Sequence, residues 1–329
     1  MKLGIIGTGM MARFVLPHIA GWGVDVVAIC GSGRSPEKVV AIADEFGIPQ
    51  RFDDYRELIA CPDIDTVYVA MPNAMHHDLT MAALDAGKHV VCEKPFATNA
   101  REAQEMADHA EELGLFLWEG MMTFRQPNFL HVRDEWLPRI GNVKLATTVF
   151  NRYSSRYDRF MAGELMQTFD PKFAGGSLMD INVYCVASLV GLFGEPLRSS
   201  YHANMVRGID TSGIMTMDYD GFKAVAIGAK DCAAPSFVLI EGTKGYILSP
   251  SEANAWEHPM TLHLNDGTEE TFNAPLGSWW EAEWSEFMRQ QDAGDLAACR
   301  RDMETTLAVS RAMTEARLAC GLIFPADKE

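Results

Sequence analysis

In the first third of the chain, short apolar runs alternate with segments in which apolar residues recur at helical spacing. The apolar runs predict buried strands at residues 2–7, 24–30, 65–71, 88–94 and 115–120. The helical patterns between them cover residues 10–20, 36–47, the segment that ends near 87, and 99–114. This alternation predicts a parallel sheet with helices on both faces, and such sheets bind ligands at the carboxyl ends of their strands.

From about residue 121 the pattern changes. It predicts a helix at 123–136 that leads out of the first domain, a strand at 143–150 and a long apolar helix at 175–194. Strand-like runs then follow without helices between them, at 197–206, 212–219, 222–228, 236–243 and 245–250. Two helical stretches end the chain, at 281–292 and about 298–320. The pattern predicts an α/β protein with a Rossmann doubly wound parallel sheet in residues 1–121 and an α+β domain with a large, mostly antiparallel open sheet in 122–329.

Composition narrows the class of protein. The 329 residues suffice for two domains, and the net charge of -17 argues against a sequence-independent nucleic-acid binder, so we expect no nucleic-acid partner. The seven cysteines are scattered, which fits reduced thiols in a cytoplasmic protein. The apolar pattern begins right after Met1 and Lys2 and so predicts no signal peptide, and no apolar run approaches the ~18 residues of a membrane span, so we expect no membrane partner. We expect no metal either, because the adjacent His76 and His77 do not point at one ion.

The first turn between strand and helix carries a dinucleotide fingerprint. "GTGMMA" places Gly7, Gly9 and Ala12 at the spacing G-x-G-x-x-A. The first glycine permits the tight turn, the second lets the backbone approach a pyrophosphate, and the alanine lets the helix pack closely on the strand. The free N–H groups at the helix N-terminus attract that pyrophosphate. The residues that we predict to bind the cofactor here are Gly7, Thr8, Gly9, Met10 and Met11.

The choice of nucleotide depends on the end of the second strand. NAD-specific sites place an acid there to bind the ribose 2′-hydroxyl, but this chain reads "CGSGRSPEK" and has no acid before Glu37. Ser32 and Arg34 can instead hold a 2′-phosphate by a hydrogen bond and by charge. The alternative is that Arg34 extends into solvent. The sequence favours NADP over NAD.

The long apolar helix carries an acid and a phenol. Asp180 and Tyr184 are four residues apart and therefore share one face of a helix, among apolar neighbours. An aspartate in such surroundings needs a partner, because an unpaired buried carboxylate is costly. Spacing alone favours a structural hydrogen bond between the two residues over a catalytic role.

Four segments together resemble a known family. "GTGMMA", "MPNAMHH", "EKPFA" and "GGSLMDINVY" occur in the order and at the separations of the Gfo/Idh/MocA oxidoreductases. "DPKFAGGSLMDINVY" and the C-terminal "TLAVSRAMTEARLACGLIFP" look most similar to the dimeric dihydrodiol dehydrogenase and sugar dehydrogenase branch. The resemblance implies an NAD(P)-dependent enzyme that transfers a hydride between a nicotinamide and a hydroxyl or carbonyl of a small carbohydrate-like substrate. It also implies that the second domain binds this substrate and forms a homodimer.

The resemblance assigns roles to individual residues. Lys94, Asp180 and Tyr184 match the catalytic positions, and Lys94 also touches the cofactor. Tyr184 is the first candidate for the proton carrier, with Lys94 as its electrostatic partner or substitute, while Asp180 orients Lys94 or the substrate hydroxyl. The Lys94–Pro95 bond is expected to be cis and to aim Lys94 into the cleft between the domains. The residues expected along the nicotinamide half of the cofactor are Pro72, Asn73, His76 and Glu93.

The chain departs from the branch near the expected substrate pocket. Met122 stands where relatives often have tryptophan, Arg125 is displaced by one position, and Asn182 replaces a glycine. These changes leave the cofactor and the chemistry in place but leave the substrate open. Two other functions also remain open, an NAD-dependent glycoside hydrolase of the same fold and a non-catalytic nucleotide-sensing regulator.

The predicted open sheet suggests how the homodimer forms. If the free face of the sheet shows residues such as Met215, Met217, Val225 and Ile227, it exposes an apolar patch that a second copy can cover. Alternation alone does not tell which of these four side chains face the helices of the same domain.

Overall fold

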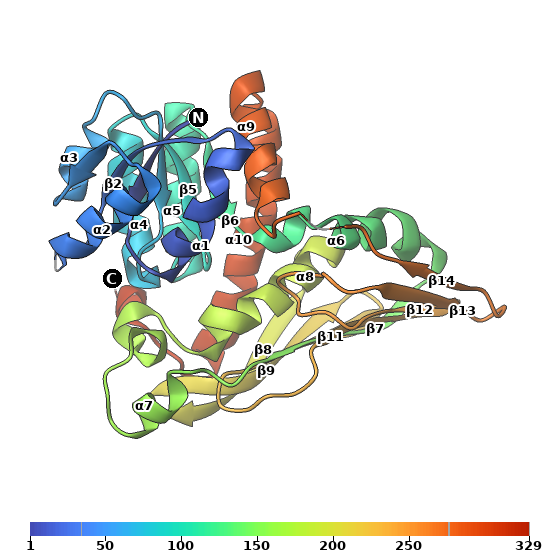
Figure 1. Ribbon diagram of the computed structural model, residues 1–329. Helices are drawn as coiled ribbons and strands as arrows, with labels where there is room; N and C mark the ends of the chain where they lie inside the picture. The colour runs from blue at the N-terminus through green and yellow to red at the C-terminus, as the bar shows by residue number, and fades with distance from the viewer. Residues whose placement is uncertain (34, 276, 329) are drawn as a thin grey trace. The chain divides into compact units, whose positions relative to one another are not determined.

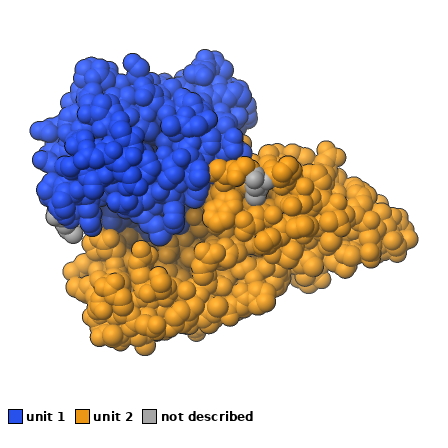
Figure 2. All heavy atoms as spheres, viewed as in Figure 1, with its two compact units in different colours: residues 1–120, 280–304 blue, residues 121–279, 305–329 orange. Residues whose placement is uncertain are grey.

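The computed structural model describes residues 1–33, 35–275 and 277–328 (Figure 1). The chain divides into two compact units, which Figure 2 colours separately. The first unit contains residues 1–120 and 280–304, and the second contains residues 121–279 and 305–329.

The first unit is a doubly wound parallel sheet. Its six strands lie in the order β3-β2-β1-β4-β5-β6, the order of a dinucleotide-binding fold. The strands are β1 (Lys2–Ile6), β2 (Asp25–Cys30), β3 (Gln50–Phe52), β4 (Thr66–Val69), β5 (His89–Glu93) and β6 (Leu117–Gly120). The helices are α1 (Met10–Ile19), α2 (Pro36–Phe46), α3 (Tyr55–Ile59), α4 (His76–Asp85) and α5 (Ala100–Leu113). The predicted Rossmann sheet is confirmed, with β3 and α3 as additional elements.

A late segment of the chain completes the core of the first unit. Helix α9 (Glu281–Ala293) buries Trp284 and Phe287 in the same apolar cluster as the strands. The ring of Trp118 on β6 stacks on Phe287 at 5.2 Å, and its Nε1–H donates to Gln290 Oε1 at 2.7 Å. Helix α10 (Leu296–Ala319) then begins in the first unit and ends in the second. The structure therefore groups residues 280–304 with the first unit, whereas the predicted boundary at 121/122 left them in the second domain.

The second unit is built on a mixed, mostly antiparallel sheet of eight strands in the order β14-β13-β12-β11-β7-β10-β9-β8. Within the described residues of this eight-stranded sheet, β7 and β10 form the only parallel pair. The strands are β7 (Val143–Asn151), β8 (Arg198–Val206), β9 (Ile209–Tyr219), β10 (Phe222–Ala229), β11 (Phe237–Gly242), β12 (Gly245–Ser249), β13 (Met260–Leu264) and β14 (Glu269–Phe272). This confirms the predicted sheet and extends it by β13 and β14.

The helices of the second unit are less regular than predicted. The segment predicted as one helix at 123–136 is broken into a 3₁₀ turn (Met122–Arg125), α6 (Pro127–His131) and a π-helical turn (Val132–Trp136). A short helix, α7 (Tyr157–Met161), follows β7. The long apolar helix begins with a π-helical turn (Leu178–Asn182) and continues as α8 (Val183–Phe193), which packs against the sheet (Figure 1).

The two faces of this sheet differ in burial. Met215 and Met217 are buried in the core that includes α8, so among the four candidate residues these two face the helices of the same domain. Strand alternation sends their neighbours to the other face. Ile214 is 43% exposed there, and Val225 and Ile227 are half-buried.

One helical segment, Pro171–Phe193, is long and apolar enough to cross a membrane, which the sequence inspection did not anticipate. Most of it is buried inside the protein. Core helices have the same length and composition, so this single segment is weak evidence for a membrane span.

Candidate functional site

The fingerprint turn has the backbone geometry that an anion site needs. Gly7 follows β1 with a φ of 133°, and a Cβ at this position would lie 2.2 Å from the carbonyl oxygen of Ala70. Gly9 is the N-cap of α1, no side chain caps the helix, and no acid lies in its first turn. No atom among the residues described lies within 4 Å of a Cβ built on Gly9, so space is left above the helix N-terminus. This arrangement fits a pyrophosphate, because N-terminal N–H groups attract anions.

The other described residues predicted to bind the cofactor at this end of the sheet are at least partly accessible. Met10 is exposed, and Thr8 and Met11 are half-buried. Ser32 lies two residues after the end of β2 and is exposed. Arg34, the second residue predicted to hold a 2′-phosphate, lies outside the described residues.

The segment after β4 is fixed from within the protein. Pro72 and Asn73 are half-buried and begin a 3₁₀ turn that leads into α4. His76 is fully buried, with Nδ1 2.9 Å from the carbonyl oxygen of Pro95 and Nε2 2.9 Å from that of Met71. Burial lowers the pKa of His76. Its ring therefore connects the loop after β4 to the turn after β5.

Strand β5 ends in a buried acid and a half-buried lysine. Tyr68 on β4 donates its hydroxyl to Glu93 Oε1, and the Lys94 backbone N–H donates to Glu93 Oε2 at 3.2 Å. Burial raises the pKa of Glu93, although Tyr68 and Lys94 act against this effect. The Lys94–Pro95 peptide bond is cis, as predicted. Lys94 thus lies at the carboxyl edge of the parallel sheet, where ligands of this fold bind.

In the second unit, Asp180 and Tyr184 are partly exposed on a mostly buried helix. Asp180 lies in the π-helical turn and Tyr184 in the first turn of α8, while Leu178, Met179 and Val183 are buried. The predicted regular α-helix is interrupted here by the π turn. Because one turn still takes about four residues, both side chains remain on one side of the helix. The accessible part of this helix therefore includes a carboxylate and a phenol.

A buried lysine that the sequence interpretation missed contacts Asp180. Lys230 follows β10, its side chain is 3% exposed, and its Nζ lies 2.6 Å from Asp180 Oδ2. The signal was present in the sequence, since "FKAVAIGAK" is an apolar strand that ends in lysine, as "HVVCEK" does. The structure thus places a cation of the second unit beside Asp180.

Two of the three departures from the family pattern are buried inside the second unit. Asn182 is fully buried, and its Nδ2 donates to the carbonyl oxygen of Ala226 at 3.3 Å. A Cβ on Gly228 would lie 2.5 Å from the Cβ of Asn182, so the two positions fit each other. Met122 is also buried, whereas Arg125 is half-buried. The side chain of Asn182 therefore packs on β10.

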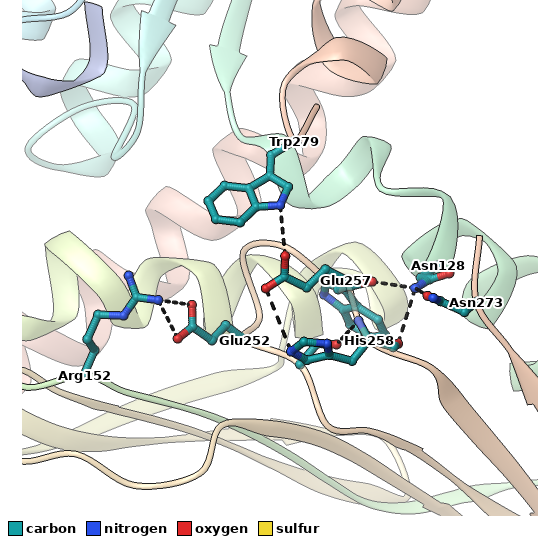
Figure 3. A network of polar contacts seen from close by, with 9 residues as sticks. Asn128, Arg152, Glu252, Glu257, His258, Asn273 and Trp279 are labelled. Atoms are coloured by element: carbon teal, nitrogen blue, oxygen red, sulfur yellow. Dashed lines mark hydrogen bonds and ion pairs between the residues drawn. The ribbon is translucent and has the colours of Figure 1, made fainter. Parts of the chain in front are cut away.

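A polar network fixes the segment between β12 and β13 (Figure 3). Glu252 accepts from Arg152 at 2.6 Å, and Glu257 accepts from Trp279 Nε1–H at 3.1 Å. The hydroxyl of Ser188, one turn after Tyr184 on α8, donates to the carbonyl oxygen of Ala253 at 3.2 Å. The segment is therefore held against α8 on the C-terminal side of Tyr184.

A surface pocket of about 650 Å³ lies elsewhere on the second unit. Its lining includes His202, Ile214 and Ile227, whose side chains lie on the face of the sheet away from α8, and it does not include Asp180 or Tyr184. Within residues 1–33, 35–275 and 277–328, no group of three His, Cys, Asp or Glu side chains is placed to hold a metal ion.

Comparison with known proteins shows the family. Residues 1–121 match the model of the GFO_IDH_MocA oxidoreductase family with an NAD-binding Rossmann fold. The chain is 34% identical to scyllo-inositol 2-dehydrogenase (NADP(+)) IolU of Bacillus subtilis over 100% of its own length and 99% of the relative. It is 30% identical to trans-1,2-dihydrobenzene-1,2-diol dehydrogenase of Xenopus tropicalis, over 83% of this chain and 81% of that protein.

Solved structures share the fold. The 3-ketoreductase KijD10 of Actinomadura kijaniata, in complex with NADP and TDP-benzene, superposes with a TM-score of 0.85 over 97% of both chains at 22% identity. The chain thus shares its fold with this reductase. The chain belongs to the Gfo/Idh/MocA family of NAD(P)-dependent oxidoreductases.

Proposed function

We propose that the chain is an NADP-dependent dehydrogenase that oxidises a secondary hydroxyl of a sugar or polyol, or reduces the corresponding carbonyl. The observation that carries this proposal is the partly exposed Asp180/Tyr184 pair on a mostly buried helix. A structural pair would be buried with its surroundings, whereas a pair that exchanges protons with a substrate must remain accessible. The NADP-dependent scyllo-inositol dehydrogenase among the relatives supports a cyclic polyol as the first substrate to test.

The residues of the first unit suit the cofactor. The backbone at Gly7 and Gly9 and the uncapped N-terminus of α1 would hold the pyrophosphate. Ser32 would bind the 2′-phosphate together with Arg34. When bound, the nicotinamide would supply the hydride acceptor or donor.

Three side chains divide the work on the substrate. We assign Lys94 to stabilise negative charge on the reacting oxygen, as a positioned ammonium does. Tyr184 carries the hydroxyl proton, because proton transfer needs a positioned acid–base group. Asp180 orients Lys94 or the substrate hydroxyl through its accessible carboxylate.

A substrate screen tests the proposal. Purified protein is mixed with NADP⁺ and, one at a time, scyllo-inositol, myo-inositol, D-xylose, D-glucose and a cyclic trans-diol, and NADPH absorbance is followed. We expect NADPH formation with at least one of these compounds. Cleavage of a nitrophenyl glycoside without net cofactor turnover would instead identify a glycoside hydrolase. Cofactor binding without turnover of any compound would favour a nucleotide sensor and refute the proposal.

We also propose that the chain forms a homodimer through the face of the eight-stranded sheet opposite α8. Ile214, Leu145 and Tyr246 are each at least 39% exposed on this face, beside the half-buried Val225 and Ile227. Exposed apolar side chains gathered on one face of a sheet favour an interaction site there. Sedimentation velocity at micromolar concentration would refute the proposal if it gave a monomer.

A further inference from the structure

Lys230 is held by several contacts within the second unit. Its ammonium lies 2.6 Å from Asp180 Oδ2, donates to the carbonyl oxygen of Thr168 at 2.9 Å, and lies 4.2 Å from the centre of the Phe169 ring. Its side chain is 3% exposed, against 34% for Asp180. The ion pair thus has a buried cation and an accessible anion.

The backbone around Lys230 is equally fixed. Its N–H donates to the carbonyl oxygen of Thr211 on β9 at 2.8 Å, and its carbonyl oxygen accepts from the N–H of Ser154 at 2.9 Å. These bonds hold both sides of the residue in the sheet. The ammonium therefore occupies a position that the fold determines, and Asp180 is placed relative to it.

The start of the π-helical turn is tied to the same strands. The buried Asp210 on β9 accepts from the Leu178 N–H at 2.6 Å and from the Tyr201 hydroxyl at 2.8 Å. A Cβ on Gly176 would lie 1.9 Å from Asp210 Oδ1, so the chain approaches this carboxylate as closely as glycine allows. Asp210 thus fixes the backbone two residues before Asp180, and Lys230 fixes the carboxylate itself.

A buried ammonium is costly unless a counter-charge lies beside it. Asp210 uses one carboxylate oxygen for Leu178 and Tyr201, and the charge of Lys230 lowers its pKa against the effect of burial, but the ion-pair contact of Lys230 is with Asp180. If the ion pair served only to orient the helix, a buried hydrogen bond between neutral groups would do so at a lower desolvation cost. A charged partner instead keeps an accessible carboxylate ionised and in one orientation.

We propose that Lys230 is a positioning residue of the dehydrogenase site, which holds the Asp180 carboxylate charged and in a fixed orientation toward the substrate. This inference rests on the proposed function, because Asp180 is assigned there to the reacting groups. Lys230 acts through Asp180 and does not itself need to touch the substrate.

Two replacements separate charge from position. Lys230→Met keeps the length of the side chain and removes the charge. We expect kcat to fall by about 10²-fold, the size of effect that misplacing a reacting group produces. The acidic limb of the kcat/KM profile should move to higher pH, because loss of the cation favours the protonated carboxyl. Lys230→Arg keeps the charge but moves it, so kcat should fall while the acidic limb stays in place.

The control is Lys223→Met. Lys223 lies on the same strand β10 and pairs with Asp218 at 2.9 Å, but its side chain is 61% exposed. We expect parent-like kcat and pH dependence for this variant, and parent-like NADPH affinity for all three variants. The inference is wrong if the Lys230 variants that fold retain the kcat of the parent and the acidic limb of its pH profile.

A double-mutant cycle gives a result that does not depend on turnover. Urea unfolding is measured for the parent, Lys230→Met, Asp180→Asn and the double variant. We expect the double variant to lose less stability than the sum of the single losses, because each single change strands a partner. Additive losses would refute the pair. If the parent shows no turnover in the substrate screen, the proposed function is refuted. The double-mutant cycle then decides only whether Lys230 and Asp180 stabilise the fold as a pair.

Discussion

At the scale of single residues, the site depends on groups that stay accessible where their neighbours are buried. Lys94 is half-buried between the buried residues Glu93 and Pro95, and Tyr184 is half-buried on a helix whose other residues are mostly buried. Both residues are thus partly accessible among mostly buried neighbours. This is what a group needs in order to meet a substrate in a fixed orientation.

The first residue-scale prediction concerns proton transfer. We expect Lys94→Ala and Tyr184→Phe each to lower kcat by about 10²-fold or more, because each removes an acid–base or charge-stabilising group. NADPH affinity, measured by fluorescence titration, should stay near that of the parent. Tyr219→Phe is the control, since its hydroxyl donates to the Gly194 carbonyl oxygen in the same unit. Near-native turnover in both site variants would contradict the assignment.

The second residue-scale prediction concerns the nucleotide. We expect the protein to bind NADPH more tightly than NADH, and Arg34→Asp to narrow or invert this preference, because an acid repels the 2′-phosphate. Arg13→Asp is the control, an exposed arginine on α1 that pairs with Glu45. Titration of nucleotide fluorescence measures both affinities. Equal affinities in the parent would show that the end of β2 does not select the phosphate.

At the scale of elements, periodicity predicted the long elements and missed the short ones. The strands of the Rossmann sheet that are apolar runs were all predictable, whereas β3 is three half-exposed or exposed residues without such a run. The strand β14 was missed for a similar reason, since it alternates only between exposed and half-buried positions. The strand β13 was missed although its buried Met260 and Leu262 alternate with polar residues. Short edge strands are determined by pairing with their neighbours more than by their own sequence.

Hydrophobic periodicity also could not predict two features of the candidate site. The π-helical turn at Leu178–Asn182 shifts the helix by one residue, but its apolar pattern reads as an ordinary helix. Lys230 ends an apolar strand just as Lys94 does, yet only the tertiary structure shows that its partner lies 50 residues earlier, at Asp180. Residues inside the sequence motifs could be identified from the sequence. Residues that contact them only in the folded structure, such as Lys230, could not.

The element-scale prediction concerns the contact between the π turn and β10. Gly228→Ala should lower the free energy of unfolding by about 1–3 kcal/mol, the usual cost of overpacking, because the new Cβ would lie 2.5 Å from that of Asn182. Gly21→Ala, where no described atom lies within 4 Å of the new Cβ, is the control. Adding Asn182→Gly to Gly228→Ala should recover much of the loss in urea unfolding. An unchanged midpoint for Gly228→Ala would contradict the close contact.

At the scale of the whole molecule, we propose that the face of the eight-stranded sheet opposite α8 is the dimer interface. We expect Ile214→Arg to convert a dimer into a monomer in sedimentation velocity, because it buries a charge in an apolar interface. Leu165→Arg introduces the same charge at a residue that is 90% exposed and lies outside the sheet, and it should leave the dimer intact. A dimer that tolerates Ile214→Arg would place the interface elsewhere.

The return of α9 to the first unit has a consequence for biosynthesis. Residues 1–120 leave the ribosome long before Trp284 and Phe287, which fill part of their core. The nascent nucleotide-binding unit must therefore wait, incompletely packed, until nearly the whole chain has been translated, unlike a domain that folds as soon as it emerges. We expect a fragment of residues 1–120 to expose apolar surface, bind a hydrophobic dye and bind NADPH poorly, whereas adding a peptide of residues 280–304 in trans should restore binding. If the fragment folds and binds NADPH by itself, folding of the first unit does not depend on translation of residues 280–304.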